Sequence, residues 1–339
     1  MRILNLRELN RALLARQALL ERVRAPLPRV VERMGGIQAQ YAPSAYIGLW
    51  SRVDGFERGD LTRALERRTL VQGTLLRGTI HIVSRRDYWA WFEAIREPQR
   101  EWLRRAWPAV AAVDVDDANA RLREALANGP RKRDDLIAEV GKERWQRADV
   151  AVLRVPPSGT WENRRAHLFA LAEEWIGPND VDVDAARELL VRRYLAAFGP
   201  ATLADIRNWA SLRTEDVHHA LESIGPRRFR DERGKELFDL RRAPLPDPET
   251  PAPPRFVGTW DAMLLAHARR TGVLPEEYRP RIFHTKAPQS FNTFLLGGAV
   301  AGTWRHERGR IELKPFRRLT RSERRELEEE AARLTAFHA

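Results

Sequence analysis

The pattern of residues 186–242 constrains the fold of this chain more than any other feature. It starts with the amphipathic stretch ARELLVRRYLAAFG, which Gly199 closes and after which Pro200 blocks a continuing helix. Two more helical stretches follow, TLADIRNWA and TEDVHHALESI, each with a threonine and acidic residues at its start. Two short strand-like runs then flank the polar turn ERGK (232–235). Three helices with a tight second turn, followed by a β-hairpin, are typical of a winged helix-turn-helix unit.

Less regular copies of this pattern precede it. Residues 119–185 contain a helix ending in NGP, the helical stretch RKRDDLIAEV, and HLFALAEEWIG, which could be a helix or a wing. Residues 1–118 contain the helical stretches LRELNRALLARQALL, PLPRVVERMGG, SAYIGLWSRV and GDLTRALERRT, followed by a glycine-turned hairpin in LVQGTLLRGTIHIVS. We therefore expect three tandem winged-helix units, at residues 1–118, 119–185 and 186–242.

The remainder of the chain has a different composition. Residues 243–255, APLPDPETPAPPR, form a proline-rich linker that cannot adopt regular secondary structure. Within residues 256–339, apolar runs broken at Gly297-Gly298 and Arg308-Gly309 predict a β-meander, and residues 320–337 predict a charged terminal helix. The expected fold class is α+β, with tandem winged-helix units and a small, mainly β C-terminal subdomain.

The charge of the chain favours a polyanionic partner. The formal net charge is +12, and only five of the 59 basic residues are lysine. Arginine's rigid fork suits phosphates and guanine edges. An arginine-rich, high-GC genome accounts for part of this bias, but not for the excess of base over acid. Residues 1–33 and residues 305–325 are arginine-rich. Each segment is a solvated helix face, or the two converge and form one positive track on a concave surface that binds double-stranded DNA.

Several function classes are excluded or disfavoured by composition. The chain has no cysteine, which excludes disulfides, thiolate zinc sites and cysteine nucleophiles. Its eight histidines show no metal-ligand spacing, so neither a metal nor another cofactor is expected. No apolar run approaches the ~20 residues of a membrane span, and MRILNLRELN lacks an apolar signal core. We expect no membrane partner and a cytoplasmic, nucleoid-associated location in a bacterium.

Four stretches carry a resemblance to a known family. They are GGIQAQYAPSAYIGLWSRV (35–53), LLRGTIHIVSRRDYW, TWDAMLLAHARR and FLLGGAVAGTWR. Together they resemble the AlkZ/YcaQ type of winged-helix DNA glycosylase over most of the chain. The resemblance implies a concave, basic cradle of tandem winged helices for duplex DNA. It also implies hydrolysis of the N-glycosidic bond of bulky N7-alkylated purines, interstrand crosslinks included.

The resemblance further implies that Gln38 and Gln40 are the catalytic residues. The family signature is Gln-x-Gln in the AlkZ branch, which is associated with self-resistance to DNA-alkylating natural products, and Gln-x-Asp in the YcaQ branch. This chain has Gln38-Ala39-Gln40 and so matches the AlkZ branch. Its amide at position 40 departs from the acidic form, which argues against the broader YcaQ-like activity.

The chemistry of the two amides fits such a role. Residues two apart in an extended segment share a face, and Gly35-Gly36 could turn both side chains toward one water. An N7-alkylguanine is cationic and leaves as a neutral base, so a positioned water and oriented dipoles can suffice without a strong base. Alternatively, the glutamines belong to a polar loop that caps backbone groups.

Other residues are candidates for binding DNA or for supporting the glutamines. Arg77, Thr79 and His81 lie in the predicted hairpin. Arg77 could bind a phosphate near the lesion or brace the hairpin. His81 could contact DNA, orient a glutamine or be a satisfied core or surface histidine. Arg213 flanks the recognition helix expected in residues 186–242. RIFHTKAPQ (281–289) is a candidate DNA-probing loop. The further candidates are Arg281, His284 and Lys286 in that loop, and Arg305 in the second arginine-rich segment.

Three functions remain open from the sequence. The first is a metal-free, monofunctional DNA glycosylase that acts as a monomer on alkylated or crosslinked DNA. The second is a non-catalytic winged-helix DNA-binding protein, such as a transcriptional regulator or a drug-sequestering protein. A regulator usually dimerises, and this chain lacks an obvious dimerisation helix. The third is an architectural or nuclease-accessory DNA-binding protein.

Overall fold

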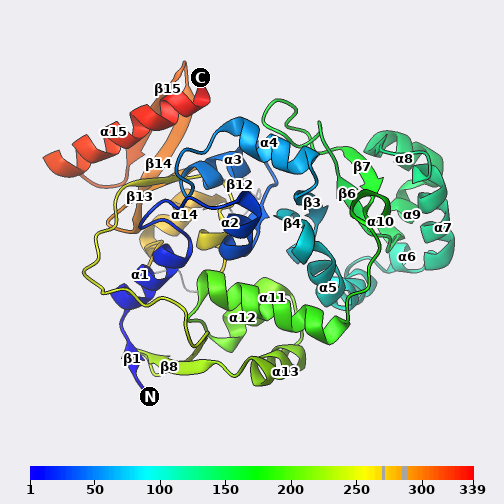
Figure 1. Ribbon diagram of the computed structural model, residues 1–339, viewed down its shortest axis with the longest axis horizontal. Coiled ribbons are helices and arrows are strands. Elements are labelled where there is room, and N and C mark those ends of the chain that lie inside the picture. Colours follow the sequence, from blue (N-terminus) through cyan, green and yellow to red (C-terminus); the bar gives the residue numbers. More distant parts are fainter. Residues whose placement is uncertain (269–271, 285–288) are drawn as a thin grey trace.

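The computed structural model describes residues 1–268, 272–284 and 289–339 and has a mixed α+β fold (Figure 1). The elements of the N-terminal part are β1 (Ile3–Leu4), α1 (Leu6–Arg16), α2 (Leu27–Met34), β2 (Ile37–Gln38), α3 (Ala42–Trp50), α4 (Arg58–Glu66), β3 (Leu70–Thr74), η1 (Leu76–Gly78) and β4 (Ile80–Ser84). The long helix α5 (Arg85–Ala106) and the short α6 (Pro108–Ala111) lead to the second part.

The second part contains α7 (Val115–Leu126), β5 (Arg131–Lys132), α8 (Arg133–Val140), α9 (Lys142–Arg147), β6 (Val152–Arg154), β7 (Leu168–Leu171) and α10 (Ala172–Ile176). The ambiguous stretch HLFALAEEWIG is therefore a strand followed by a helix. The boundary predicted after residue 118 is wrong, because it falls inside α7. That helix begins earlier because the Asp114 carboxylate accepts hydrogen bonds from the backbone N–H groups of Asp116 and Asp117.

The third part contains α11 (Val183–Phe198), α12 (Leu203–Ala210), α13 (Thr214–Ile224), β8 (Arg227–Asp231) and β9 (Glu236–Asp239). The three helices and the hairpin predicted here are present, and Thr202 and Asp205 form a capping box at the start of α12. The assignment of residues 1–16 to the first unit is not what the structure shows. β1 pairs in parallel with β8, and α1 packs against α11, so this segment is part of the third part.

The C-terminal part contains β10 (Arg255–Val257), η2 (Ala262–Leu264), η3 (Glu276–Tyr278), α14 (Arg279–Ile282), β11 (Phe283–His284), β12 (Gln289–Ser290), β13 (Thr293–Leu296), β14 (Ala299–Glu307), β15 (Arg310–Pro315) and α15 (Arg321–His338). The β-meander turns at Gly297-Gly298 and Arg308-Gly309, as predicted. This part has no separate core, because Phe294, Leu296 and Leu334 join one buried cluster with Val31 and Tyr46.

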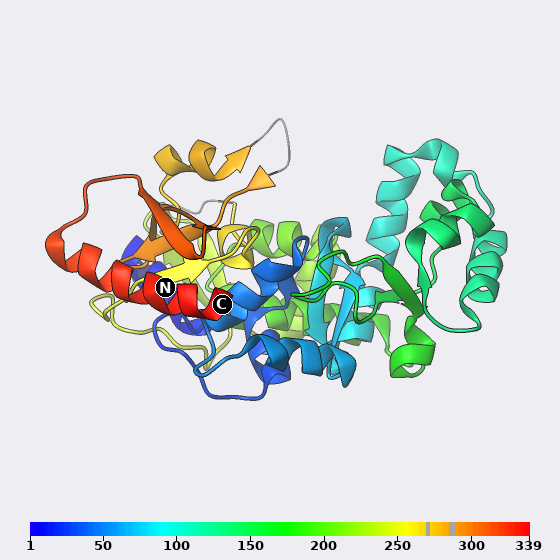
Figure 2. The ribbon, with the colours of Figure 1, turned by 90° about the horizontal axis from the view of Figure 1, so that it is seen from above.

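One sheet joins the first two parts of the chain. Its six strands follow the order β2-β4-β3-β6-β7-β5, and the junction pairs Gln72 with Arg154 and Gly73 with Leu153. The helices α7, α8 and α9 lie at one end of the molecule, and α15 lies at the opposite end (Figure 2). The sheet thus runs without a break from the strand that carries Gln38 to the distant second part.

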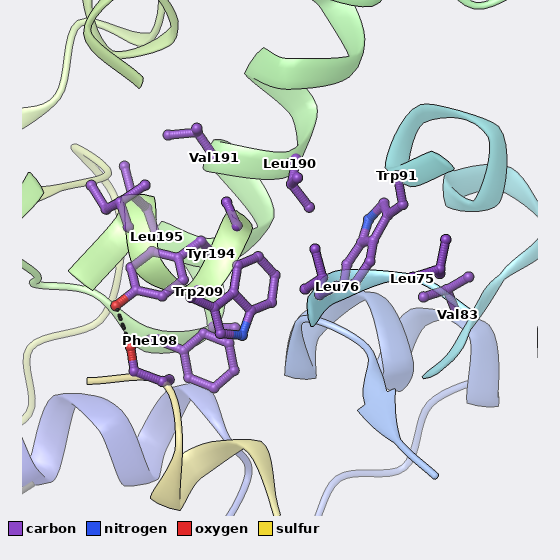
Figure 3. Packing of buried hydrophobic residues seen from close by; sticks show 14 of the residues in the cluster. Leu75, Leu76, Val83, Trp91, Leu190, Val191, Tyr194, Leu195, Phe198 and Trp209 are labelled. Atoms are coloured by element: carbon purple, nitrogen blue, oxygen red, sulfur yellow. Dashed lines mark hydrogen bonds between the residues drawn. The ribbon is translucent and has the colours of Figure 1, made fainter. Parts of the chain in front are cut away.

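An aromatic cluster fixes the helices beneath this sheet (Figure 3). The ring of Trp91 on α5 meets that of Trp209 on α12 edge to face, with centroids 5.5 Å apart. Tyr194 and Phe198 on α11 complete the cluster, and the Tyr194 hydroxyl donates to the Ala266 carbonyl at 2.9 Å. This packing brings the end of α12 next to η1.

Candidate active site

The turn before the two glutamines is built from glycines that no other residue could easily replace. Gly35 caps α2 with φ 71°, and Gly36 follows with φ 75°, both in the left-handed region. A Cβ on Gly35 would lie 2.9 Å from Phe198 Cε2, and one on Gly36 would lie 2.8 Å from Trp91 Cη2. The turn is therefore seated directly on the aromatic cluster, which fixes the direction in which the chain enters β2.

Backbone pairing with β4 positions both glutamines. Gln38 lies opposite His81 in the sheet, and the N–H of Ala39 donates to the carbonyl of Ile80 at 2.8 Å. The side-chain oxygen of Gln40 accepts from the Ile80 N–H at 2.7 Å. The oxygen of Gln38 lies 3.5 Å from Arg77 Nη2, at the long limit of a hydrogen bond. Each amide oxygen thus has one partner, and each retains a second lone pair.

The two glutamines line different spaces. Gln38 is 7% exposed and lines a pocket of about 10 Å³ with Ser44 and Asp261, which is about the space that one water needs. Gln40 is exposed and lines a cleft of about 1720 Å³. We expected both amides to face one water. The structure instead places Gln40 in the lining of the cleft and Gln38 in the lining of the small pocket.

Arg77 and Thr79 shape the hairpin turn next to the glutamines. Arg77 has a left-handed backbone (φ 56°), and its Nη1 donates to the carbonyl of Trp209 at 2.9 Å while Nη2 approaches Gln38. The hydroxyl of Thr79 donates to the carbonyl of Leu76 at 3.0 Å. Arg77 also lines the cleft. It therefore connects α12, the cleft and the Gln38 amide.

His81 supports this corner from inside the protein. Burial and, to a lesser extent, the nearby Arg77 charge lower its pKa to about 3, and a hydrogen bond to Thr79 opposes both effects. The ring is consequently neutral at pH 7, and Nδ1 carries the proton because it lies 3.1 Å from the Thr79 carbonyl. With 3% exposure, His81 does not present its ring to a ligand on the surface. Of the three interpretations, direct contact with DNA is therefore wrong.

The lining of the large cleft is rich in guanidinium groups. The basic lining residues are Arg77, Arg96, Arg100, Arg105, Lys132, Arg133, Arg147, Arg154, Arg164, Arg165, Arg207 and Arg213, and the acidic ones are Glu101, Asp134 and Asp149. They come from η1, from α5, from the second part, and from α12 and the turn that follows it. The arginine-rich segments 1–33 and 305–325 are fully described by the structure, and they contribute no residue to this lining.

Many of the arginines of those two segments instead pair with carboxylates. Arg16 is buried against Asp239 at 2.7 Å, and Arg305 pairs with Glu312 at 2.7 Å on the outer sheet. The hydrogen bond that Arg305 donates to Glu312 is the largest factor that raises the pKa of Arg305. The two segments therefore do not line this cleft, and the single positive track expected if they converged is not formed there.

The remaining predicted residues are scattered. Arg213 lines the cleft, where it pairs with Glu101. Arg281 lies over the ring of Phe316, 3.9 Å from its centroid, outside the cleft. His284 belongs to the backbone of β11, which pairs with β12. Lys286 lies outside the described residues. The structure thus brings together Gln38, Gln40 and the hairpin residues 77–81, with Arg213 across the same cleft.

Comparisons with known proteins identify the family. The model of a family described as "DNA glycosylase AlkZ-like" matches residues 31–337. The chain belongs to the AlkZ-like DNA glycosylase family. It is 23% identical to an interstrand DNA cross-link repair glycosylase of Streptomyces sahachiroi, over 94% of this chain and 92% of that protein. The solved structure of Streptomyces sahachiroi DNA glycosylase AlkZ is similar in fold, with a TM-score of 0.81 at 20% identity over 99% of this chain and 98% of that one.

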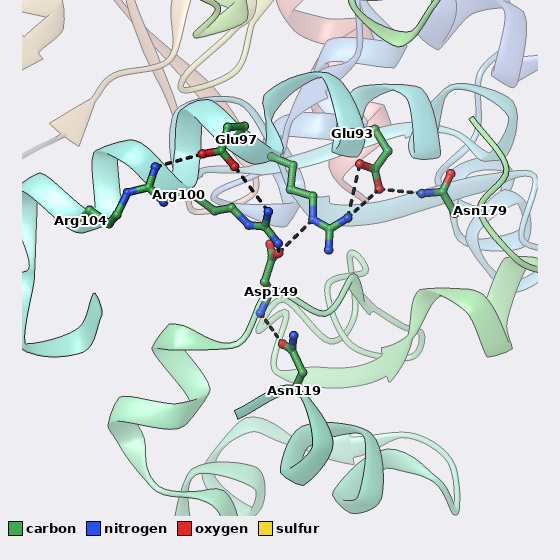
Figure 4. Close-up of polar contacts among 8 residues, drawn as sticks. Glu93, Glu97, Arg100, Arg104, Asn119, Asp149 and Asn179 are labelled. Carbon is green, nitrogen blue, oxygen red and sulfur yellow. Dashed lines mark hydrogen bonds and ion pairs between the residues drawn. The ribbon is translucent and has the colours of Figure 1, made fainter. Parts of the chain in front are cut away.

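A network of ion pairs holds one wall of the cleft in this AlkZ-like chain (Figure 4). Asp149 accepts from Arg96 at 2.9 Å and from Arg100, both on α5, while its backbone N–H donates to Asn119 of α7 at 2.8 Å. Glu93 and Glu97 share the same arginines. The network fastens the second part to α5, and these guanidinium groups already have carboxylate partners.

Sequence reasoning missed most of the arginines in the cleft. They are spread singly or in pairs over residues 77–213, so no local charge density marks them. It also missed the exposed tryptophans Trp102 and Trp107, which line the same cleft. Among the described residues, no group of three or more histidine or acidic side chains could hold a metal ion. Within that part of the chain, no helix has both the length and the apolar character of a membrane span.

Proposed function

We propose that this chain is a monofunctional DNA glycosylase that removes bulky N7-alkylated purines, interstrand crosslinks included, from double-stranded DNA. Gln38 and Gln40 are its catalytic residues. One observation carries the proposal: in an AlkZ-like chain, the Gln-Ala-Gln segment is held against β4 at the edge of a cleft of about 1720 Å³ that arginines line. The function that the name of the Streptomyces relative states supports the choice of lesion.

The reaction needs little from the protein beyond positioning and dipoles. Cleavage of the bond between C1′ and N9 lets the cationic N7-alkylpurine leave with the bonding electrons as a neutral base. A water then attacks the oxocarbenium-like C1′ and releases its proton to solvent. Gln38 would hold this water in or at the mouth of its small pocket, and the free lone pair of Gln40 would face the sugar from the cleft. Neither amide takes up a proton.

The size of the cleft supports a bulky lesion. Pockets for small ligands measure about 300–1,000 Å³, and this cleft exceeds that range. A base that is crosslinked to the other strand cannot be extruded into a closed pocket, whereas an open cleft can receive the lesion within the duplex. The backbone would be held by lining arginines such as Arg133, Arg164 and Arg207.

We also propose that three winged-helix units build this cradle. The order helix, strand, helix, helix, hairpin occurs twice, as α2-β2-α3-α4-β3-β4 and as α7-β5-α8-α9-β6-β7. The third part has the same order, α11-α12-α13-β8-β9, except that a single β-bridge at Ala201 replaces the first strand. A single chain with three such units can span a duplex without a partner, which supports a monomer. Repair of self-inflicted alkylation at the nucleoid, in the bacterial cytoplasm, is the setting that fits this activity.

The test compares single substitutions on defined lesions. Purified protein is incubated with a duplex that carries one N7-methylguanine or one crosslink, and alkali then converts each abasic site into a strand break. Gln38→Ala and Gln40→Ala should lose excision and keep their affinity for DNA. Gln146→Ala, which removes another glutamine from the lining of the cleft that contains Gln40, is the matched control and should remain active. Unchanged excision in both variants would refute the assignment, and a sequence-specific footprint without base release would favour a regulator.

A further inference from the structure

Two tryptophans in the cleft have no structural reason to be exposed. Of the eleven tryptophans in the chain, all of them described by the structure, only Trp102 and Trp107 are exposed, at 55% and 46%. Trp102 lies in the last turns of α5, and Trp107 links that helix to α6. Exposed tryptophans that stand next to each other are rare on a surface that binds nothing, because each leaves a large apolar area in water.

The two rings form a wedge in the wall of the cleft. Their centroids are 5.9 Å apart and their planes are inclined by 52°, so they are not stacked on each other. Both line the cleft that contains Gln40, together with Arg105 between them in the sequence. An aromatic surface flanked by guanidinium groups binds a planar ring that is attached to a polyanion.

We propose that Trp102 and Trp107 bind the planar aromatic ring of the adduct itself, by stacking, while the duplex lies in the cleft. Paired bases hide their faces inside the helical stack, and phosphates and sugars offer no π-face. Purine N7 lies on the major-groove edge of the base. A substituent on N7 therefore projects out of the stack, where it is the one flat surface that an intact duplex presents to the protein.

This proposal rests on the proposed function, because it assigns the part of an N7 adduct that the enzyme recognises. Catalysis at the sugar involves the glutamines, whereas the tryptophans act on the body of the lesion. They are thus residues that determine specificity. An aromatic adduct should gain affinity over a saturated adduct of the same carbon skeleton, and that gain should require the two indole rings.

The experiment uses two matched lesions and two matched double variants. Duplexes carry N7-benzylguanine or N7-(cyclohexylmethyl)guanine on a 2′-fluoro sugar, which resists base loss and lets binding to the intact lesion be measured by fluorescence anisotropy. Trp102→Leu with Trp107→Leu keeps an apolar surface without a π-face, and Trp102→Phe with Trp107→Phe keeps planar rings. Stacking predicts that the leucine variant binds the benzyl duplex about tenfold more weakly than the wild-type protein does. The phenylalanine variant should retain most of the affinity, and the cyclohexylmethyl duplex should bind all three proteins alike.

Three results would overturn the proposal. The first is an unchanged affinity of the leucine variant for the benzyl duplex. The second is an equal loss on all duplexes, including an unmodified one with a single unpaired base, which would make the tryptophans a general DNA or base contact. The third is a phenylalanine variant as weak as the leucine variant. Excision of N7-methylguanine, a lesion without a ring, should be normal in both variants, which checks their folding. If the wild-type protein excises no lesion, the proposed function fails, and the anisotropy result still decides the role of the tryptophans.

Discussion

Substitution of Gly36 by alanine tests the idea that the aromatic cluster fixes the direction of the catalytic strand. Gly36 has φ 75°, and its new Cβ would lie 2.8 Å from Trp91 Cη2 and 3.3 Å from Val83 Cγ1. Trp91 cannot easily move away, because it is 1% exposed and packs against Trp209 on its other side. A left-handed alanine costs about 1–2 kcal/mol, and overpacking of a dense core adds about 1–3 kcal/mol. The expected loss of unfolding free energy is thus about 2–5 kcal/mol.

The chain offers a matched control for this experiment. Gly55 has φ 68°, and a Cβ there would meet nothing within 4 Å, so Gly55→Ala should lose only the conformational term of about 1–2 kcal/mol. Urea denaturation followed by tryptophan fluorescence gives the two free energies, and their difference isolates the contacts with Trp91 and Val83. Excision by folded Gly36→Ala should also fall, because β2 must shift to relieve the clash. Equal losses in the two variants would refute the argument that Trp91 constrains the turn.

Three further predictions address charge. The folded pKa of His81, about 3, lies below its usual value of 6.5, so between these values the unfolded chain binds a proton that the folded chain does not. The free energy of unfolding therefore falls as the pH drops from 6.5 toward 3. In a thermal-melting series against pH, His81→Gln should reduce the slope of this free energy by up to about 1.4 kcal/mol per pH unit. Arg133→Ala in the cleft should weaken DNA binding and reduce the magnitude of the slope of log affinity against log salt concentration by about 0.9. The control Arg324→Ala on α15 should change neither quantity. Anisotropy titrations at several salt concentrations measure both. Asp239→Ala leaves the buried Arg16 without its carboxylate, and calorimetry should show a loss of about 3–5 kcal/mol.

The parts of the fold that local signals specify could be predicted from the sequence. The capping box at Thr202 and Asp205, the glycine C-cap at Gly35 and the meander turn at Gly297-Gly298 each act over a few residues, and the structure has all three. The glutamine pair could be identified only through the family signature. The extended backbone at Gln38 was predictable from the glycines that precede it, because the turn forces the chain out of the helix.

Long-range pairing accounts for what could not be predicted. Ile3 pairs with Arg230, and nothing near either residue marks the other as its partner. The pocket at Gln38 likewise depends on Asp261, which a buried ion pair with Arg52 holds in place from a distant part of the chain. The separate surroundings of Gln38 and Gln40 follow from such contacts, so spacing along the chain did not predict the cavity that each amide lines.

The distribution of arginine shows why local charge density is a poor guide to a binding surface. A guanidinium attracts a phosphate only when its field is not already balanced by a neighbouring carboxylate. In the segments that are richest in arginine, pairs such as Arg317 with Glu323 on the outer face provide that balance, and their charge contributes to stability. In the cleft, Arg96, Arg100 and Arg213 pair with carboxylates, but twelve basic residues in all face only three acidic ones, although they are dispersed in the sequence. The six-stranded sheet concentrates them, because it joins the hairpin of the first part to the strands of the second and places Gln40 at the edge of their common field.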